Sequence, residues 1–402
     1  MKKFFKYIFH YDRIGVCITT FVLFWFLKIL TFNLDILNPV EDALENFSIS
    51  DTFFEIQHSA TEPETNDLIT IVDMTDLHKR GDIAMMLEEI NLNNPLIVGV
   101  DLIFEGVKDD SHGNALLEGA TQNISDITIF SRKFTGYDSS RGEFTGNVRS
   151  YFANSLGVTE AYTNLNGNMS GACIREFSLK QTCNGEELLS FPAKIASAFD
   201  ESLLLRENKN ILINFKNVKF NVVKWDEIAE NSDLIEGHIV LVGTMTEEQD
   251  MHMTPLGKMP GLELQAFSLL TLLEHKNIRT VPIWVTLLFA FLVCFLFELT
   301  IYVVHRLMDK YPNNAFWVFV KESEIALLIL LFLFVVVVCL LSFSLFVHKS
   351  IVVESGIVVT AMILLVEGRK IYFAMKLAFG KSRVRRLFVN YRLKKKSDAQ
   401  NQ

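Results

Sequence analysis

The chain has 402 residues, of which 50% are hydrophobic and 21% charged, and its formal net charge is −9. The acidity lies in one segment: residues 35–280 contain 18 Lys+Arg and 39 Asp+Glu, a net charge of −21, whereas the rest has 20 basic and 8 acidic residues, a net charge of +12. An acidic segment of this size repels polyanions, which excludes nucleic acid as a partner.

Four apolar segments flank the acidic one, and they are residues 14–34, 283–304, 325–347 and 351–367. Each is near the roughly 20 residues that a helix needs to cross a bilayer. We therefore expect a four-helix transmembrane region with one N-terminal and three C-terminal spans. The first segment is too long for a signal peptide and contains the bulky run Phe21–Leu27, so it should remain as an anchor.

Basic residues predict the orientation of these spans. Residues 1–13 and the tail 368–402 are rich in Lys and Arg, and short basic flanks stay on the cytoplasmic side. Both termini should thus be cytoplasmic, with residues 35–282 extracytoplasmic and the chain a multi-pass protein of the cell inner (cytoplasmic) membrane. The lipid bilayer is then its first partner, and the basic tail also suits an amphipathic helix on anionic lipid.

Cysteines are sparse outside the predicted spans, where only Cys173 and Cys183 occur. An oxidising compartment would permit a disulfide between them. Cys183 adjoins the turn signal Asn184-Gly185, however, and Cys173 lies far up the preceding strand. A disulfide across that hairpin is therefore geometrically doubtful, and both states stay open.

Strand and helix patterns alternate through the acidic segment. Its first half predicts a strand at Leu68–Val72, a helix at Asp82–Ile90, a strand at Leu96–Phe104, a helix at 115–120 and a strand at Ile124–Phe130. Residues 134–186 predict antiparallel additions and loops. The second half predicts a helix at Ser190–Phe199, strands at Ile211–Phe215 and Ile239–Val242, and a helix at Leu262–Glu274. This alternation predicts an α/β fold with a mixed, largely parallel sheet and flanking helices.

Three blocks of the segment are similar to a known family. Residues 97–104 read Ile-Val-Gly-Val-Asp-Leu-Ile-Phe, residues 237–244 read Gly-His-Ile-Val-Leu-Val-Gly-Thr, and residues 254–266 run from Thr-Pro-Leu-Gly to Leu-Gln-Ala. They resemble hallmark stretches of the type-2 CHASE family, the extracellular sensory domains associated with cyclases and histidine kinases. The resemblance covers residues 40–282, and three spans directly after the domain are a usual architecture of that family.

Two departures from the family pattern affect what the resemblance implies. The family often has a Trp-Pro-Trp-like element where this chain has His78-Lys79-Arg80-Gly81. Family members also commonly continue into a cyclase, kinase or phosphatase domain, whereas only residues 368–402 follow the last span here. The resemblance therefore implies a member without a fused output domain.

The sequence lacks the motifs of several common enzyme classes. It has no phosphate-binding Gly-x-x-x-x-Gly-Lys-Ser/Thr loop, no Gly-x-Ser-x-Gly elbow, no His-Glu-x-x-His and no Cys-x-x-Cys. We expect no catalytic activity and no cofactor.

Four aspartates are the candidate ligand-binding residues of the outer segment. Asp101 interrupts an apolar strand, where a carboxylate is costly unless paired, so it either contacts a ligand or caps the next loop. Asp109 and Asp110 could bind a divalent cation through oxygen atoms, but clustered aspartates before a helix are more often N-caps, and we assign no metal. Asp250, with His252 nearby, either contacts a ligand or lies in a solvated loop.

Three ionisable residues fall within the predicted spans, where such residues are rare and usually functional. Lys28 and Glu354 have similar expected depths and could pair across the bundle, although Lys28 could also extend to the interface alone. Glu298 lies near the inner end of its span, where placement at the interface is the simpler explanation.

These features favour a membrane-anchored extracytoplasmic sensor without catalysis. It would bind an unknown ligand or envelope protein and signal through its spans to a separately encoded cytosolic partner, as a homo-oligomer or with a partner membrane protein. The alternative is a non-switching structural or assembly subunit of an envelope complex. A bound small molecule in the outer domain would favour the sensor, and a flat apolar contact surface would favour the subunit.

Overall fold

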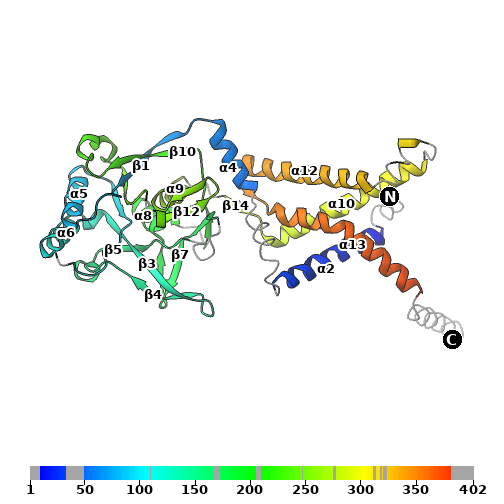
Figure 1. Cartoon of the computed structure of the whole chain (residues 1–402), viewed down its shortest axis with the longest axis horizontal. Helices are drawn as coiled ribbons and strands as arrows, with labels where there is room; N and C mark the ends of the chain where they lie inside the picture. Colours follow the sequence, from blue (N-terminus) through cyan, green and yellow to red (C-terminus); the bar gives the residue numbers. More distant parts are fainter. Residues whose placement is uncertain are drawn as a thin grey trace. The chain divides into compact units, whose positions relative to one another are not determined.

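The structure is a computed structural model, and it describes residues 10–32, 49–108, 110–165, 173–204, 210–246, 248–274, 278–310, 314–316, 319 and 324–381. The chain divides into two compact units (Figure 1). One comprises Met1–Ile49 and Thr280–Gln402, and we call it the helical unit. The other comprises Ser50–Arg279, and we call it the sheet unit.

The sheet unit begins with α4 (Ile49–Ala60) and alternates strands with helices. In chain order it contains β1 (Glu64–Asp73), α5 (Arg80–Leu92), β2 (Ile97–Val100), α6 (Ser111–Ile124), β3 (Thr128–Asp138), β4 (Glu143–Val148), α7 (Ala153–Leu156) and β5 (Thr159–Tyr162). There follow β6 (Glu176–Ser178), β7 (Lys180–Cys183), β8 (Glu186–Leu189), α8 (Phe191–Phe199), β9 (Asn210–Leu212), β10 (Val218–Lys224), β11 (Ile239–Gly243), β12 (Met251–Thr254), β13 (Gly257–Pro260) and α9 (Gly261–Leu273).

One mixed sheet organises this unit. Its order is β10-β1-β11-β2-β3-β4-β7-β8, with β5 also pairing with β3. The pairs from β10 to β3, and the β3–β5 pair, are parallel, whereas β3–β4 and β7–β8 are antiparallel. Helix α5 connects β1 to β2, which lie on either side of β11, and α6 connects the parallel neighbours β2 and β3. The mixed α/β prediction is confirmed.

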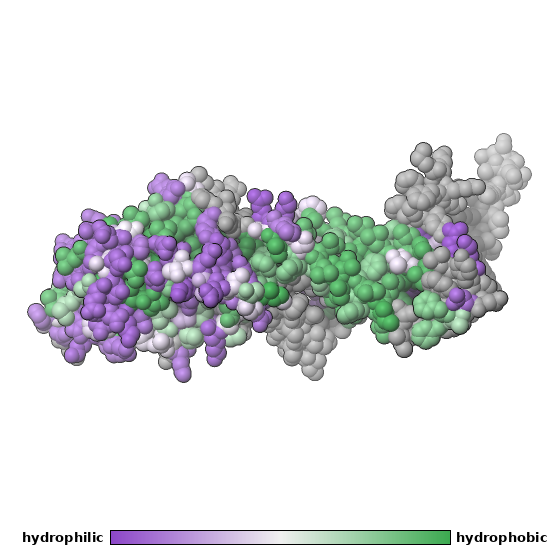
Figure 2. Space-filling view, turned by 90° about the horizontal axis from the view of Figure 1, so that it is seen from above, coloured by the Kyte–Doolittle hydropathy of each residue, from purple (hydrophilic) through white to green (hydrophobic). Residues whose placement is uncertain are grey.

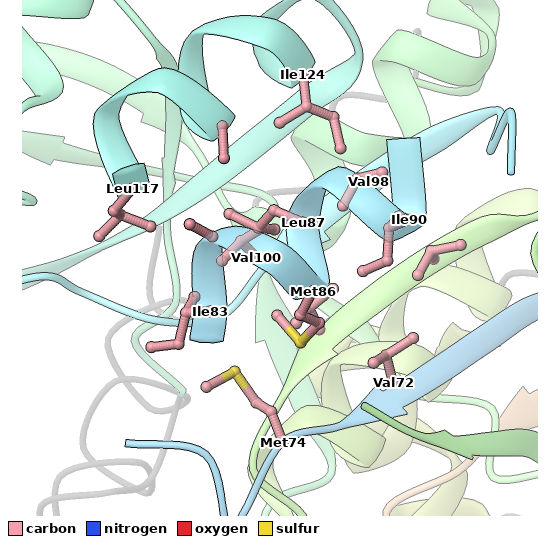
Figure 3. Close-up of a cluster of buried hydrophobic side chains, with 14 of the residues drawn as sticks. Val72, Met74, Ile83, Met86, Leu87, Ile90, Val98, Val100, Leu117 and Ile124 are labelled. Atoms are coloured by element: carbon pink, nitrogen blue, oxygen red, sulfur yellow. The ribbon is translucent and has the colours of Figure 1, made fainter. Parts of the chain in front are cut away.

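Side chains alternate between the two faces of the central strands, because successive residues of a strand point to opposite sides. One face packs against α5 and α6 in a core that includes Val72, Val100 and Leu87 (Figure 3). The other face lies under α8. There a Cβ on Gly99 would lie 2.7 Å from Ile195 Cδ1 and 2.8 Å from Phe191 Cζ, so only glycine lets α8 approach β2 this closely.

Several boundaries differ from the sequence expectations. The strand predicted at Leu96–Phe104 ends at Val100, because the residues after Asp101 leave the sheet as a connection to α6. Strand β10 and helix α4 were not predicted. The β10 sequence Val218–Lys224 has a half-polar alternation with two lysines at exposed positions, which is typical of an edge strand and gives a weaker signal than a buried one.

The helical unit consists mainly of α2 (Tyr11–Phe32), α10 (Ile283–Lys310), α12 (Glu324–Lys349) and α13 (Ser355–Lys381). By length and apolar composition, two helices of the described residues could cross a bilayer, through Ile283–Arg306 and Leu327–Lys349. Figure 2 shows hydrophobic residues over much of these helices and hydrophilic residues over much of the sheet unit. The count of four spans stays a prediction.

Small residues let α2 and α13 pack closely. A Cβ on Gly368 of α13 would lie 3.0 Å from Thr20 Cα of α2, and one on Gly15 of α2 would overlap the Tyr372 ring. Glycine at both contacts allows the backbones to approach, which is also typical of helix pairs in membranes. The fourth apolar segment is only partly helical as predicted, because β15 (Ile351–Val352) precedes α13 and α13 continues to Lys381.

Candidate functional site

The carboxyl ends of the central parallel strands meet at one edge of the sheet, which is where ligands bind in open α/β sheets. Val100 of β2 is in register with Val242 of β11 and with Phe130 of β3. The next residue of each strand therefore continues the same row. Asp101 lies between Gly243 and Ser131 in this row.

Asp101 directly follows β2 and keeps the sheet register, since its N–H donates to the Val242 carbonyl at 2.8 Å. Its side chain lies close to Gly243, where an added Cβ would be 3.5 Å from the Asp101 Cβ. Burial, and then the charge of Asp250, raises the pKa of Asp101 to about 7. The Ser131 hydroxyl and His252 oppose this rise.

Asp250 reaches the same edge from another part of the chain. It ends the 3₁₀ turn η5 (Glu248–Asp250), and its Oδ1 lies 3.3 Å from His252 Nε2 in β12. Its carboxylate also lies against Gly261, the first residue of α9, where a Cβ would be only 2.6 Å from Oδ2. The partial positive charge of a helix N-terminus favours a carboxylate there.

The sheet edge thus brings Asp101 and Asp250 together, as two of the four predicted ligand-binding residues. A carboxyl group with a pKa near neutrality beside a second carboxylate can donate or accept a hydrogen bond, or attract a cation. Ser131, which is 1% exposed, adds a hydroxyl with no hydrogen-bond partner of good geometry in the described part of the chain. We call Asp101, Ser131, Asp250 and His252 the carboxyl-edge site.

Asp110 lies elsewhere and caps a helix. Its Oδ1 accepts a hydrogen bond from the Gly113 N–H at 2.9 Å, at the N-terminus of α6. Of the two roles that the sequence left open for Asp110, cation ligand or N-cap, the structure shows the N-cap. Asp109 lies outside the described residues. Among the residues that the structure describes, no three His, Cys, Asp or Glu side chains are grouped so that they could hold a metal ion.

Arg80 was noted in the sequence only as a departure from the family pattern, yet it fixes the loop after Asp101. The residue is 3% exposed, and its guanidinium donates to the Gly106 carbonyl at 2.7 Å and to the Asn114 side-chain oxygen. It also lies over the Tyr151 ring, 4.7 Å from the centroid. Neither periodicity nor a motif signals this role, because the partners come from three distant segments.

A buried ion-pair cluster borders the same region of the sheet and was also missed. Glu160 of β5 accepts from Arg149 Nε at 2.6 Å, and Arg132 Nη1 lies 3.9 Å away. The Glu160 side chain is only 2% exposed. Breaking such a pair from one side leaves a buried charge, so the cluster holds β5 and the segment after β4 together.

The two outer cysteines are both free thiols in the structure. Cys173 precedes β6, which pairs with β9, whereas Cys183 ends β7, which pairs with β4 and β8 in another sheet. The Cys183 thiol is buried and lies 3.5 Å from the Gly146 carbonyl oxygen. The fold thus places the two residues on different strand pairs.

The structure does not bring Lys28 and Glu354 together. Glu354 precedes α13 and is exposed, and no ion pair joins it to Lys28 among the described residues. The contacts of Gly15 with Tyr372 and of Thr20 with Gly368 set an antiparallel register. Continued along the helices, it places Lys28 opposite about residue 360, roughly 9 Å along the axis from Glu354.

Glu298 is instead buried within the helical unit. Its side chain is 6% exposed, and its Oε1 lies 3.5 Å from Arg369 Nη1 of α13. Arg13 of α2 and His305 of α10 act on the same carboxylate. Arg13 also lies over the Tyr302 ring at 4.3 Å. The Glu298 side chain is therefore buried in contact with Arg369 of α13 and within electrostatic range of Arg13 of α2, and its placement at the membrane interface stays a prediction.

Comparison with known families decides what kind of domain this is. The family model described as the CHASE2 domain matches residues 19–304, which is most of the chain. The chain belongs to the CHASE2 family. CHASE2 is an extracellular sensory domain family, and the resemblance inferred from the sequence blocks is confirmed. No curated protein and no solved structure matches the chain.

Membership of the CHASE2 family bears on the role of the carboxyl-edge site. A CHASE2 domain is sensory rather than catalytic. Its blocks around residues 97–104 and 237–244 are β2 and β11 with the residues that follow them, which include Asp101 and Gly243. The family resemblance and the geometry therefore converge on the same edge of the sheet.

Proposed function

We propose that the chain is a membrane-anchored extracytoplasmic sensor whose ligand binds at the carboxyl-edge site. The observation that carries this proposal is the approach of Asp101 to Asp250 at the edge of a parallel sheet in a CHASE2 domain. No Lys or Arg of the described residues forms an ion pair with either carboxylate. Asp250 pairs with His252, which belongs to the same site, so no ion pair among the described residues ties either acid to another part of the fold.

The membrane arrangement that we propose has four spans, with both termini in the cytoplasm and the sheet unit outside. Two apolar helices, the basic flanks and the close packing of α2 with α13 support it. Cysteines at Ser139, in the exposed hairpin turn after β3, and at Ser397 test it in intact cells. An impermeant thiol reagent should label the first position only. Labelling of Ser397→Cys would overturn this topology.

Signals would leave the sheet unit through α4 and α9, which adjoin the first and second spans in sequence. Phe215, fully buried, joins the two helices, with ring centroids 5.7 Å from Phe54 of α4 and 5.6 Å from Phe267 of α9. Asp51 of α4 also forms a two-oxygen contact with Arg175, at 2.6 Å for the shorter bond. Because Gly261 at the N-terminus of α9 touches Asp250, a ligand at the site can act on this helix directly.

The output would pass to a separately encoded cytosolic partner, which the basic residues after Arg369 would contact. Co-purification from native membranes, followed by mass spectrometry, tests this. Deleting the residues after Gly380 should leave membrane insertion intact and remove the partner. Undiminished recovery with the truncated chain would contradict this output route.

The same co-purification separates a sensor from a non-switching subunit. In a sensor, Asp101→Asn alters the recovery of the partner, because the site and the output are coupled. Asp126→Asn, an exposed aspartate of the sheet unit outside the site, is the matched control and should change nothing. Equal recovery with wild type and both variants would favour the structural subunit.

A further inference from the structure

A cavity of about 330 Å³ lies inside the helical unit, between α10, α12 and α13. Most of its wall is apolar, and the charged side chains in it belong to Glu298, Arg369 and Lys370. The lining residues are Phe297, Glu298, Ile301, Leu327, Leu365, Val366, Arg369, Lys370 and Phe373. Its size is at the lower end of the range for ligand pockets in proteins.

Arg369 has unused hydrogen-bonding capacity at this cavity. A guanidinium carries five N–H donors. Arg369 uses one of them, in the single 3.5 Å contact with Glu298, and its Cζ lies 5.9 Å from the Phe373 ring centroid. Within the described residues, no further acceptor is bonded to it, although its side chain is only 29% exposed. A guanidinium in this setting favours an anion that can accept two parallel hydrogen bonds.

Glu298 does not need Arg369 alone to balance its charge. Arg13, on a different helix, and His305, on the same helix, also lie within electrostatic range of this carboxylate. Arg369 can therefore contact a second anion without leaving Glu298 as an unpaired buried charge. Lys370, next in sequence and 60% exposed, lies at the rim of the cavity, and its Nζ is 2.8 Å from Glu367 Oε1.

We propose that this cavity binds one anionic phospholipid of the surrounding bilayer, with an acyl chain against the apolar wall and the phosphate on Arg369 and Lys370. The apolar wall requires a hydrocarbon partner, which a free phosphate ion lacks. A headgroup with a net negative charge suits the Arg369 guanidinium better than a zwitterionic one, whose own cation would lie close to Arg369 and Lys370. Basic pockets between membrane helices are known to bind acidic headgroups in this way.

The bound lipid would also complete the packing of α12. Leu327, in the first turns of α12, lines one side of the cavity, and α10 and α13 line the others. An acyl chain there contacts all three helices at once. The proposal is independent of the sensory function, since it concerns only the helical unit and its lipid environment.

Native mass spectrometry of the full-length chain in mild detergent tests the proposal, with phosphatidylglycerol and phosphatidylcholine as probes. Wild type should retain one phosphatidylglycerol with about tenfold preference over phosphatidylcholine, because phosphatidylcholine carries the same phosphate but also a choline cation, which Arg369 and Lys370 repel. Arg369→Gln should abolish the preference, and Arg369→Lys should restore part of it. Equal retention of the two lipids by wild type would overturn the proposal.

Two further variants keep the test decisive if Arg369→Gln does not fold. Val366→Trp fills the cavity and leaves the Glu298–Arg369 contact in place, so it should lose the bound lipid. Lys349→Gln removes a cation at the other end of α12, about 33 Å from Leu327, and this variant should retain the bound lipid. The proposal places the lipid wrongly if Val366→Trp retains as much phosphatidylglycerol as wild type. It also does so if Lys349→Gln loses as much of the lipid as Val366→Trp.

Discussion

Replacing Asp101 by Asn should stabilise the sheet unit at neutral and alkaline pH. In the folded chain the pKa of Asp101 is raised from 3.8 to about 7, first by burial and then by the charge of Asp250. Below about pH 4 the carboxyl is protonated in both the folded and the unfolded chain, so it carries no penalty. As the pH rises, the unfolded chain loses this proton first, and the free energy of unfolding falls until about pH 7.

The size of this effect follows from the two pKa values. Each pKa unit corresponds to about 1.4 kcal/mol, so a rise of about three units lowers the free energy of unfolding by about 4 kcal/mol at most. For a unit of this size, such a difference shifts the unfolding temperature by roughly 10 °C. Asn is nearly isosteric with the protonated acid but cannot ionise, so the variant lacks the part of the stability loss between pH 4 and pH 8 that Asp101 causes.

Thermal unfolding of the detergent-solubilised chain measures this effect, from pH 4 to pH 8. Trp225 packs against the core shared by α5 and α6 and reports on the sheet unit. Asp126→Asn, exposed and outside the site, is the control and should follow wild type. If wild type and Asp101→Asn lose stability in parallel between pH 4 and pH 8, Asp101 does not titrate near neutrality and the reasoning is wrong.

Three other substitutions test separate contacts. Gly261→Ala should displace the Asp250 carboxylate, because the new Cβ would lie 2.6 Å from its Oδ2. In the same pH series, the stability loss caused by Asp101 should then have its midpoint at a lower pH. An unchanged midpoint would contradict the contact between Asp250 and Gly261. Asp51→Ala and Arg175→Ala should each destabilise α4, as measured by hydrogen exchange of its amides. Their double-mutant cycle should give a coupling energy of about 1 kcal/mol or more, whereas additive effects would show that the contact does not stabilise α4. Lys28→Leu and Glu354→Leu should have additive effects on folded yield, since no ion pair joins the two among the described residues. A double variant with a higher folded yield than either single variant would reveal an ion pair between them.

The sequence predicted those parts of the fold that rest on local periodicity. Strand β11 and helices α5, α8 and α9 lie within a few residues of their expected positions, because each is a continuous apolar or helical-period segment. The end of β2 was not predictable in this way. Leu102 and Phe104 remain partly or fully buried after the strand has ended, so burial continues where sheet pairing does not.

The candidate site was predictable only in part. Asp101 is conspicuous in sequence, because a carboxylate follows four buried apolar residues. Its approach to Asp250 depends on the position of β11 beside β2 and on the turn before β12, and neither is encoded by spacing. Asp110 shows the limit of local reasoning, since an aspartate before a helix fits both a ligand and a cap until its acceptor contact with Gly113 is seen.

The position of β11 has a consequence for how the sheet unit assembles. β11 (Ile239–Gly243) is the last parallel strand of the chain, yet it lies between β1 and β2, the first two. While the chain is being synthesised, β1 and β2 have no common partner until almost the whole unit has emerged. Their apolar edges must remain unpaired for that time, and contacts of such long sequence separation form slowly. The nascent chain should therefore depend on chaperones during synthesis more than a sheet built from consecutive hairpins.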